Sequence, residues 1–224
     1  MTLRLPDSGA ETSPDGRRHA PSAARNAAPI LAMLRTELPP QGRLLEIAAG
    51  TGQHAAEFSA ALPQIDWQPT DVNPDNLASI TAWRATAGPN LRAPVVLDAT
   101  RPDWSADWPN QDAILIVNLL HLIPAHAVET LLDQAARALS PSGVLLIYGP
   151  FLRDGLATSD GDAAFHASLQ AQDPAIGYKD LPLAGQKAYT LVKGKDTPQT
   201  PGGFKGRVGL YEEMEVTEQI QNLI

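Results

Sequence analysis

The sequence predicts an α/β protein whose mostly parallel, twisted sheet carries helices on both faces. Between residues 43 and 148, apolar runs of strand length alternate with segments of helical periodicity five times, as in chains built from βα units. The run 112–117 is continuously apolar, which is typical of a strand covered on both faces. A turn at Gly50 to Gly52 joins the first strand to a helix, as in a Rossmann-like nucleotide-binding sheet.

The N-terminal residues are expected to form a flexible arm followed by a helix. Residues 1–22 are rich in proline and glycine and contain almost no large apolar side chain after Leu5. The pattern changes at Asn26, and Pro29 suits the first turn of a helix. Its apolar positions are Ile30, Leu31, Leu34 and Leu38, and it ends at Pro39 and Pro40.

Three strands with intervening helices are predicted next. They are strand 43–48, helix 53–62, strand 66–70, a helix from Asn73 to Gly88 and strand 93–97. Asn73 and Pro74 suit the N-cap and first position of the second helix. The second strand ends at Asp71 and the third at Asp98, so both acids are expected at the carboxyl edge of the sheet.

The remaining elements lie further along the chain. Strand 112–117, helix 124–139 and strand 144–148 are predicted, with a turn from Pro141 to Gly143 before the last strand. After Ile176 the signal fades, although 188–192 and 207–211 fit short strands and 212–223 fits a helix. We therefore divide the chain into a flexible arm (1–22), a cofactor-binding domain (23–177) and a divergent C-terminal segment (178–224) that is expected to be partly disordered.

Composition restricts the function. A net charge of −8 at pH 7 argues against nonspecific nucleic-acid binding and against anionic membrane surfaces. The chain has no cysteine, which excludes disulfides and thiolate metal sites, and no zinc or calcium motif predicts a metal. Neither a secretory signal nor an apolar run long enough to cross a bilayer is visible. We expect a cytoplasmic protein with a small-molecule substrate, and its oligomeric state stays open.

Three acids at strand ends, Glu46, Asp71 and Asp98, form the central constellation. Asp71 is placed to accept both hydrogen bonds of a ribose diol, and Asp98 to meet an adenine amine. Glu46 would face the far side of the ribose. S-adenosylmethionine carries an ammonium and a sulfonium there, whereas NAD carries a pyrophosphate that a carboxylate would repel. Taken singly, such acids often only cap helices or lie in solvent, but three beside a glycine turn favour the sulfonium cofactor.

Asn118 and His121 follow the fourth strand, where substrate and cofactor are expected to meet. Asn118 could hold the cofactor or its transferred group. His121 is a candidate general base because its ordinary pKa is near neutrality. The competing interpretation is that His121 packs under the next helix, and methyl transfer to an already nucleophilic acceptor needs no base.

Several motifs together resemble a known family. They are Arg25-Asn26-x-x-Pro29-Ile30-Leu31, Leu45-Glu46-Ile47-Ala48-x-Gly50-Thr51-Gly52-Gln53-His54, Trp67-Gln68-Pro69-x-Asp71, Asn118-x-x-His121 and Tyr148-Gly149-Pro150-Phe151. The chain from about Pro21 to Gly177 is similar to the class I S-adenosylmethionine-dependent methyltransferase-like family long catalogued as a domain of unknown function, which includes methyltransferase-like protein twenty-six.

The resemblance implies a Rossmann-like methyltransferase fold and a set of cofactor contacts. These are Glu46, Gly50, Thr51, Gly52, Asp71, Asp98 and Asn118, with Arg25 and Asn26 closing over the cofactor. Family members continue after the equivalent of Gly177 into a helix and an antiparallel hairpin, a pattern that 178–224 does not follow. That departure predicts an exposed edge beside strand 144–148.

The sequence therefore predicts a protein that binds S-adenosylmethionine and transfers its methyl group to a small molecule. Two alternatives stay open. One is a cofactor-binding module that no longer catalyses and acts as a sensor or partner, suggested by the unusual C-terminus. The other is an NAD-dependent oxidoreductase, because residues 50–55 also match the degenerate Gly-x-Gly-x-x-Ala dinucleotide pattern.

Overall fold

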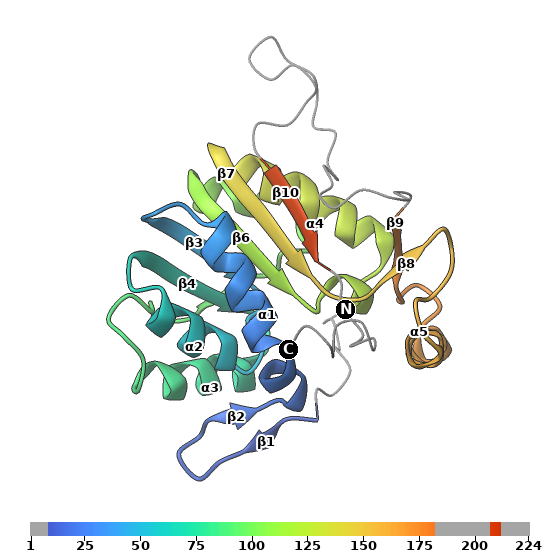
Figure 1. Ribbon diagram of the computed structural model, residues 1–224, viewed down its shortest axis with the longest axis horizontal. Helices are drawn as coiled ribbons and strands as arrows, with labels where there is room; N and C mark the ends of the chain where they lie inside the picture. Colours follow the sequence, from blue (N-terminus) through green and yellow to red (C-terminus); the bar gives the residue numbers. More distant parts are fainter. Residues whose placement is uncertain (1–8, 182–206, 212–224) are drawn as a thin grey trace, which may run out of the picture.

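A parallel sheet forms the centre of the molecule (Figure 1). The structure, a computed structural model, describes residues 9–181 and the strand at 207–211. Within these residues, six strands pair in the order β10-β7-β6-β3-β4-β5, and all the pairings are parallel. The strands are β3 (Gly42–Ile47), β4 (Ile65–Asp71), β5 (Val95–Val96), β6 (Gln111–Val117), β7 (Leu139–Tyr148) and β10 (Arg207–Tyr211). The predicted α/β fold class is confirmed.

Helices cover both faces of this sheet (Figure 1). The helices are α1 (Pro21–Glu37), α2 (Gln53–Ala61), α3 (Pro74–Arg84), α4 (Ala125–Ala138) and α5 (Asp160–Gln172), with the 3-10 turns η1 (Trp104–Asp107) and η2 (Leu120–Leu122). On one face, Ile30 and Leu34 of α1 and Phe58 of α2 are fully buried against the sheet. On the other, Leu131 and Ala135 of α4 pack with η1. Two apolar cores thus hold the sheet between helical layers.

The N-terminal segment is more ordered than its composition predicts. β1 (Glu11–Thr12) and β2 (Arg18–His19) form an antiparallel hairpin. The Arg17 guanidinium lies 4.7 Å from the centre of the Trp83 ring in α3, and the His19 ring meets the same indole edge-on. From residue 9 onward, the segment expected to be a flexible arm therefore forms a hairpin that contacts α3 through residues distant in sequence.

Helix α1 begins earlier than its apolar pattern indicates. It starts at Pro21, so Pro29 lies inside the helix instead of in its first turn. Pro21 occupies the position where the missing N–H of proline costs nothing, which suits a helix start. Pro29 removes one internal hydrogen bond of the helix. The burial of Ile30 and Leu34, which lie one turn apart on the same face, offsets that loss.

The ends of two strands also differ from the prediction. β5 contains only two residues, Val95–Val96, instead of 93–97. β7 starts directly after α4, and the predicted turn from Pro141 to Gly143 is an irregularity within that strand. Leu139 pairs with Gln111 and Val144 with Ala113, so the intervening residues of β7 bulge out of the ladder.

A small C-terminal lobe lies beside the carboxyl ends of β6 and β7 (Figure 1). It consists of α5 and the parallel pair β8 (Phe151–Arg153) and β9 (Lys179–Leu181). The Ser159 side chain caps α5 by accepting a hydrogen bond from the N–H of Asp162 at 3.1 Å. The Tyr178 hydroxyl donates to Asp162 at 2.9 Å. The sequence prediction missed these elements, although Ser159 followed by Asp162 is a recognisable helix start.

Strand β10 covers the edge that was expected to be exposed. It pairs in parallel with β7 from Arg207 opposite Val144 to Tyr211 opposite Tyr148. The predicted strand at 207–211 is thus confirmed, and the prediction of an open edge beside β7 is wrong. The predicted strand 188–192 and helix 212–223 lie outside the described residues.

Candidate functional site at the carboxyl edge of the sheet

The loop between β3 and α2 contains two glycines with different roles. Both adopt left-handed backbone angles, with φ of 59° at Gly50 and 82° at Gly52. A Cβ atom at Gly52 would approach the Cα of Ile80 in α3 to 2.8 Å. A Cβ atom at Gly50 would meet nothing within 4 Å. Gly52 therefore allows α2 and α3 to pack closely, whereas the peptide groups at Gly50 border open space.

Two residues other than glycine share the left-handed conformation at neighbouring strand ends. Ala48 follows β3 with φ of 54°, and Asn118 follows β6 with φ of 53°. Alanine is disfavoured in this region, and such strain is often found at ligand sites. Asn118 was predicted as a site residue but Ala48 was not, because a positive φ leaves no mark in the sequence when the residue is alanine.

Asp71 organises the loops around it. It is 1% exposed at the end of β4, and its carboxylate accepts hydrogen bonds from the N–H groups of Gly50 at 2.9 Å and Asn73 at 2.8 Å. Burial raises the pKa of Asp71, and these backbone donors together with the Asn76 side chain oppose that increase. The carboxylate therefore ties the glycine loop to the start of α3 and lies where the sequence predicted it.

Glu46 is deeper than the sequence analysis expected. Its side chain is 1% exposed and accepts a hydrogen bond from the indole N–H of Trp67 at 2.7 Å. Burial raises its pKa to about 8, the Trp67 hydrogen bond opposes this, and the neighbouring charge of Asp71 adds to it. Burial thus favours the protonated form of Glu46 in the protein without ligand. No local pattern in the sequence indicates its partner Trp67.

Thr51 and Asp98 complete the loop and the third strand end. The carbonyl oxygen of Thr51 accepts a hydrogen bond from the Ser79 hydroxyl at 2.7 Å. The Asp98 carboxylate accepts from the N–H of Thr100 at 3.1 Å and from its hydroxyl at 2.6 Å. The N–H of Leu97 donates to the carbonyl oxygen of Asp71 at 3.2 Å, so Asp98 lies next to the second strand end, with part of its hydrogen-bonding capacity used within its own turn.

Asn118, Asn26 and His54 meet beneath the edge. In the amide orientation that satisfies both groups, Asn26 Nδ2 donates to His54 Nε2 at 2.8 Å, and Asn26 Oδ1 accepts from Asn118 Nδ2 at 3.3 Å. Asn26 is only 2% exposed, so it supports Asn118 from inside the protein instead of closing over a ligand. Arg25, the other residue expected to close over the cofactor, is exposed on α1. His54 belongs to the family motif, but no role was predicted for it.

His121 lies in an aromatic cluster of the C-terminal lobe. Its ring meets those of Phe165 and Tyr178 edge-on, at centroid distances of 5.8 and 5.9 Å. Its carbonyl oxygen accepts a hydrogen bond from the N–H of Gly177 at 2.9 Å. Burial lowers its pKa to about 4, and the positive charge of Lys179 adds to this effect. The geometry matches the packing interpretation, with a neutral ring that joins η2 to α5.

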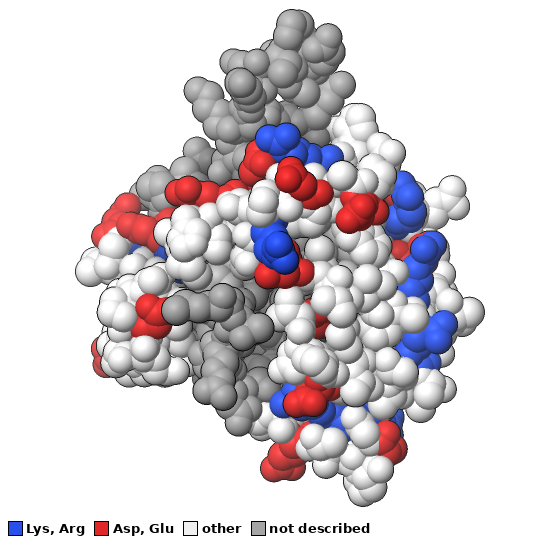
Figure 2. All heavy atoms as spheres, turned by 180° about the vertical axis from the view of Figure 1, so that it is seen from behind, with Lys and Arg blue, Asp and Glu red and all other residues white. Residues whose placement is uncertain are grey.

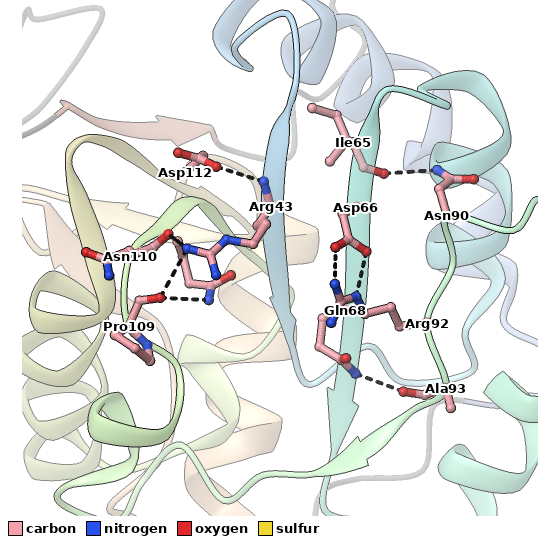
Figure 3. Close-up of polar contacts among 11 residues, drawn as sticks. Arg43, Ile65, Asp66, Gln68, Asn90, Arg92, Ala93, Pro109, Asn110 and Asp112 are labelled. Carbon is pink, nitrogen blue, oxygen red and sulfur yellow. Dashed lines mark hydrogen bonds and ion pairs between the residues drawn. The ribbon is translucent and has the colours of Figure 1, made fainter.

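A hollow of about 200 Å³ lies at the opposite end of the strands. Its lining includes Arg43, Asp66, Gln68 and Arg92 (Figure 3). Arg92 forms an ion pair with Asp66, and Arg43 Nη2 donates to the carbonyl oxygen of Asn110 at 2.5 Å. Both arginines are therefore engaged with protein oxygens, and this hollow is separate from the carboxyl edge.

The surface shown in Figure 2 has both signs of charge. Basic and acidic side chains are spread over this face of the molecule.

Among the residues that the structure describes, no helix is long and apolar enough to span a membrane.

Solved structures share this fold. An O-methyltransferase family protein from Burkholderia thailandensis matches with a TM-score of 0.59 and 18% identity over 72% of this chain and 49% of its own. Human N-acetylserotonin methyltransferase, solved in complex with SAM, matches with a TM-score of 0.57 and 15% identity over 72% of this chain and 44% of its own. This chain spans about half the length of these structures. It has the fold of the class I, Rossmann-like methyltransferases.

The family model described as "Protein of unknown function (DUF938)" matches residues 17–199. The chain belongs to this family, as the sequence motifs predicted. The match extends past Gly177, where the sequence analysis placed the start of a divergent segment, and ends among residues that the structure does not describe.

Proposed function

We propose that this protein binds S-adenosylmethionine at the carboxyl edge of its sheet and transfers the methyl group to a small molecule, as an enzyme whose site lies within residues 23–177. The observation that carries the proposal is the arrangement at Gly50. Its left-handed peptide borders open space, and the Asp71 carboxylate lies 2.9 Å from its nitrogen. A backbone cradle beside a buried acid suits a ribose diol.

The polar groups around this cradle fit the rest of the cofactor. Asn118 Oδ1 is buried without a hydrogen-bond partner among the described residues, and a ligand donor would satisfy it. Glu46 and Asp71 place acidic groups along the same edge, and a cationic group bound beside Glu46 would favour its ionised form, whereas a pyrophosphate would oppose it. S-adenosylmethionine, when bound, supplies an electrophilic methyl group on a sulfonium.

The chain's own residues would contribute alignment and exclusion of water. The acceptor would enter beside Asn118 and the segment from Tyr148 to Phe151, whose two aromatic side chains are 6% and 3% exposed and form a wall. Alignment of two reactants can supply much of the rate of such a transfer. Because the His121 ring is held against Phe165 and Tyr178, we assign it to packing and propose no general base.

Calorimetric titration with S-adenosylmethionine, S-adenosylhomocysteine and NADH in one buffer tests the proposal. We expect saturable binding of the first two and none of NADH, and a screen for methylated products would follow. Binding of NADH alone would support an oxidoreductase. Binding of the sulfonium cofactor without any product across a broad panel would support a non-catalytic sensor.

Gly50→Val provides the matching test of the site. A β-branched side chain would strain the backbone and fill the open space, so binding should be lost while the fold survives. Gly155→Val is the control, because Gly155 also has a positive φ, 77°, with nothing within 4 Å of an added Cβ, yet lies in the loop after β8. Normal binding by Gly50→Val would contradict the proposed cradle.

A further inference from the structure

The buried amide of Asn26 lies between two other side chains. Its nitrogen donates to His54 Nε2 at 2.8 Å and to the carbonyl oxygen of Ser22 at 2.8 Å. Its oxygen accepts from Asn118 Nδ2 at 3.3 Å. This chain of contacts runs from α2 through α1 to the end of β6, so it joins three elements that are distant in sequence.

His54 packs against this amide. Its ring is 7% exposed and stacks on Phe58 with a centroid distance of 4.9 Å and an interplanar angle of 11°. Burial lowers its pKa to about 4, and Nε2 of the neutral ring lies 2.8 Å from the Asn26 amide and 3.0 Å from the carbonyl oxygen of Ala23. The carbonyl oxygens of Ser22 and Ala23, at 2.8 and 3.0 Å, can only accept, so they require the Asn26 nitrogen to face them and leave only its oxygen for Asn118.

The orientation of Asn118 follows from that of Asn26. With Nδ2 directed to Asn26, the oxygen Oδ1 faces away from it and has no hydrogen-bond partner among the described residues. The N–H of Asn118 donates to the carbonyl oxygen of Tyr148 at 2.8 Å, and the Asn118 backbone is left-handed, with φ of 53°. A Cβ atom at Gly149 would lie 3.4 Å from Oδ1. The orphaned oxygen thus lies beside a glycine at the end of β7.

We propose that Asn26 and His54 are positioning residues, which hold the Asn118 amide so that its carbonyl oxygen accepts a hydrogen bond from the ammonium group of the cofactor. The identity of that donor rests on the proposed function. Asn118 Oδ1 then accepts a hydrogen bond from the ligand. The site therefore favours ligands that carry the amino-acid end of the cofactor over ligands that lack it. Asn118 touches the ligand, whereas Asn26 and His54 act through Asn118.

Two nucleoside probes isolate this contact. S-adenosylhomocysteine carries the ammonium group, and 5′-methylthioadenosine lacks the entire amino-acid end, while both are uncharged at sulfur. Asn118→Gly keeps the positive φ and removes the oxygen. We expect it to lower the affinity for S-adenosylhomocysteine about tenfold or more, as for loss of a charge-assisted hydrogen bond, and to leave the affinity for 5′-methylthioadenosine within about twofold.

The positioning residues are tested in the same titration. Asn26→Leu and His54→Phe, which keeps an aromatic ring stacked on Phe58, should each weaken S-adenosylhomocysteine binding several-fold and spare 5′-methylthioadenosine. In the Asn118→Gly background neither change should have a further effect, because both act through that side chain. Gln134→Leu is the matched control, since it replaces a buried amide that bonds Ser105 on the opposite face.

The outcomes separate the two proposals. If the wild-type protein binds neither probe nor S-adenosylmethionine, the proposed function fails and this inference fails with it. If the wild type binds but the variants lose affinity equally for both probes, or the effects add in the double variants, the cofactor site stands and the positioning role is wrong. His54→Phe answers the question alone if Asn26→Leu does not fold.

Discussion

At the scale of single residues, Glu46 combines a functional position with an unfavourable environment. It is fully buried, its carboxyl group contacts the Trp67 indole, and it lies near a second acid, Asp71. Buried acids without a cationic partner favour their neutral form. A cationic ligand would stabilise the ionised form of Glu46. Cofactor binding would therefore offset the free energy that burial of this carboxyl group costs in the free protein.

Glu46→Gln should stabilise the ligand-free protein at neutral and alkaline pH. The folded-state pKa of about 8 lies above the ordinary 4.5, so the stability that Glu46 supports is present below pH 4.5 and is lost as the pH rises to 8. We expect the variant's advantage in free energy of unfolding to grow across this range to roughly 1–3 kcal/mol. Urea denaturation at several pH values measures it, and an advantage independent of pH would contradict the burial of the charge.

Asp71→Ala should weaken binding of S-adenosylmethionine by about 1–3 kcal/mol, as for loss of hydrogen bonds to a diol and of the contact that holds Gly50. Calorimetry gives the difference directly. Asp66→Ala is the control, because Asp66 lies on the same strand at its opposite end (Figure 3). Equal affinities in wild type and Asp71→Ala would show that the cofactor does not occupy this edge.

At the scale of elements, the β1–β2 hairpin braces the site through α3. The Ser79 hydroxyl, which is fully buried, accepts a hydrogen bond from the N–H of Arg18 at 2.8 Å and donates to the carbonyl oxygen of Thr51 at 2.7 Å. Arg18 Nη1 also donates to Asn76 at 2.5 Å, close to Asp71. The hairpin, α3 and the glycine loop therefore form one connected unit.

Ser79→Ala should lower the free energy of unfolding by about 1–3 kcal/mol, because it leaves the part-buried N–H of Arg18 and the buried carbonyl oxygen of Thr51 without their shared partner. Chemical denaturation gives the value. Ser168→Ala serves for comparison, since that hydroxyl bonds the carbonyl oxygen of Phe165 on an exposed part of α5, and should change stability by less than about 0.5 kcal/mol. A similar small effect at Ser79 would mean that the hairpin does not brace the loop.

At the scale of the whole molecule, two buried histidines set its response to acid. His54 anchors α1 to α2, and His121 anchors η2 to the C-terminal lobe; burial lowers the pKa of each to about 4. Stability from a depressed histidine pKa is present above the ordinary value of 6.5 and is lost as the pH falls toward 4. Glu46 acts in the opposite direction, because its raised pKa costs stability as the pH rises.

We expect the midpoint of urea unfolding to fall steadily between pH 6.5 and pH 4. His121→Phe should reduce this acid sensitivity, because an apolar ring in the cluster of Phe165 and Tyr178 binds no proton in either state. The comparison uses denaturation curves at half-unit pH intervals. Identical pH dependence in variant and wild type would show that His121 ionises freely in the folded protein.

Local sequence determined much of this protein. The apolar runs specified β3, β4 and β6, and the positions of Asp71 and Asn118 after two of these strands placed both residues at one edge of the sheet. Gly50 and Gly52 specified the turn after β3. All these features could be predicted because each strand or turn depends on a few neighbouring residues. Tertiary structure alone decided the rest. It paired Glu46 with Trp67, brought Asn26, His54 and Asn118 together, and packed the hairpin on α3. These contacts join residues about 20 to 90 positions apart. No local sequence pattern specifies which distant side chain will pair with a buried polar group.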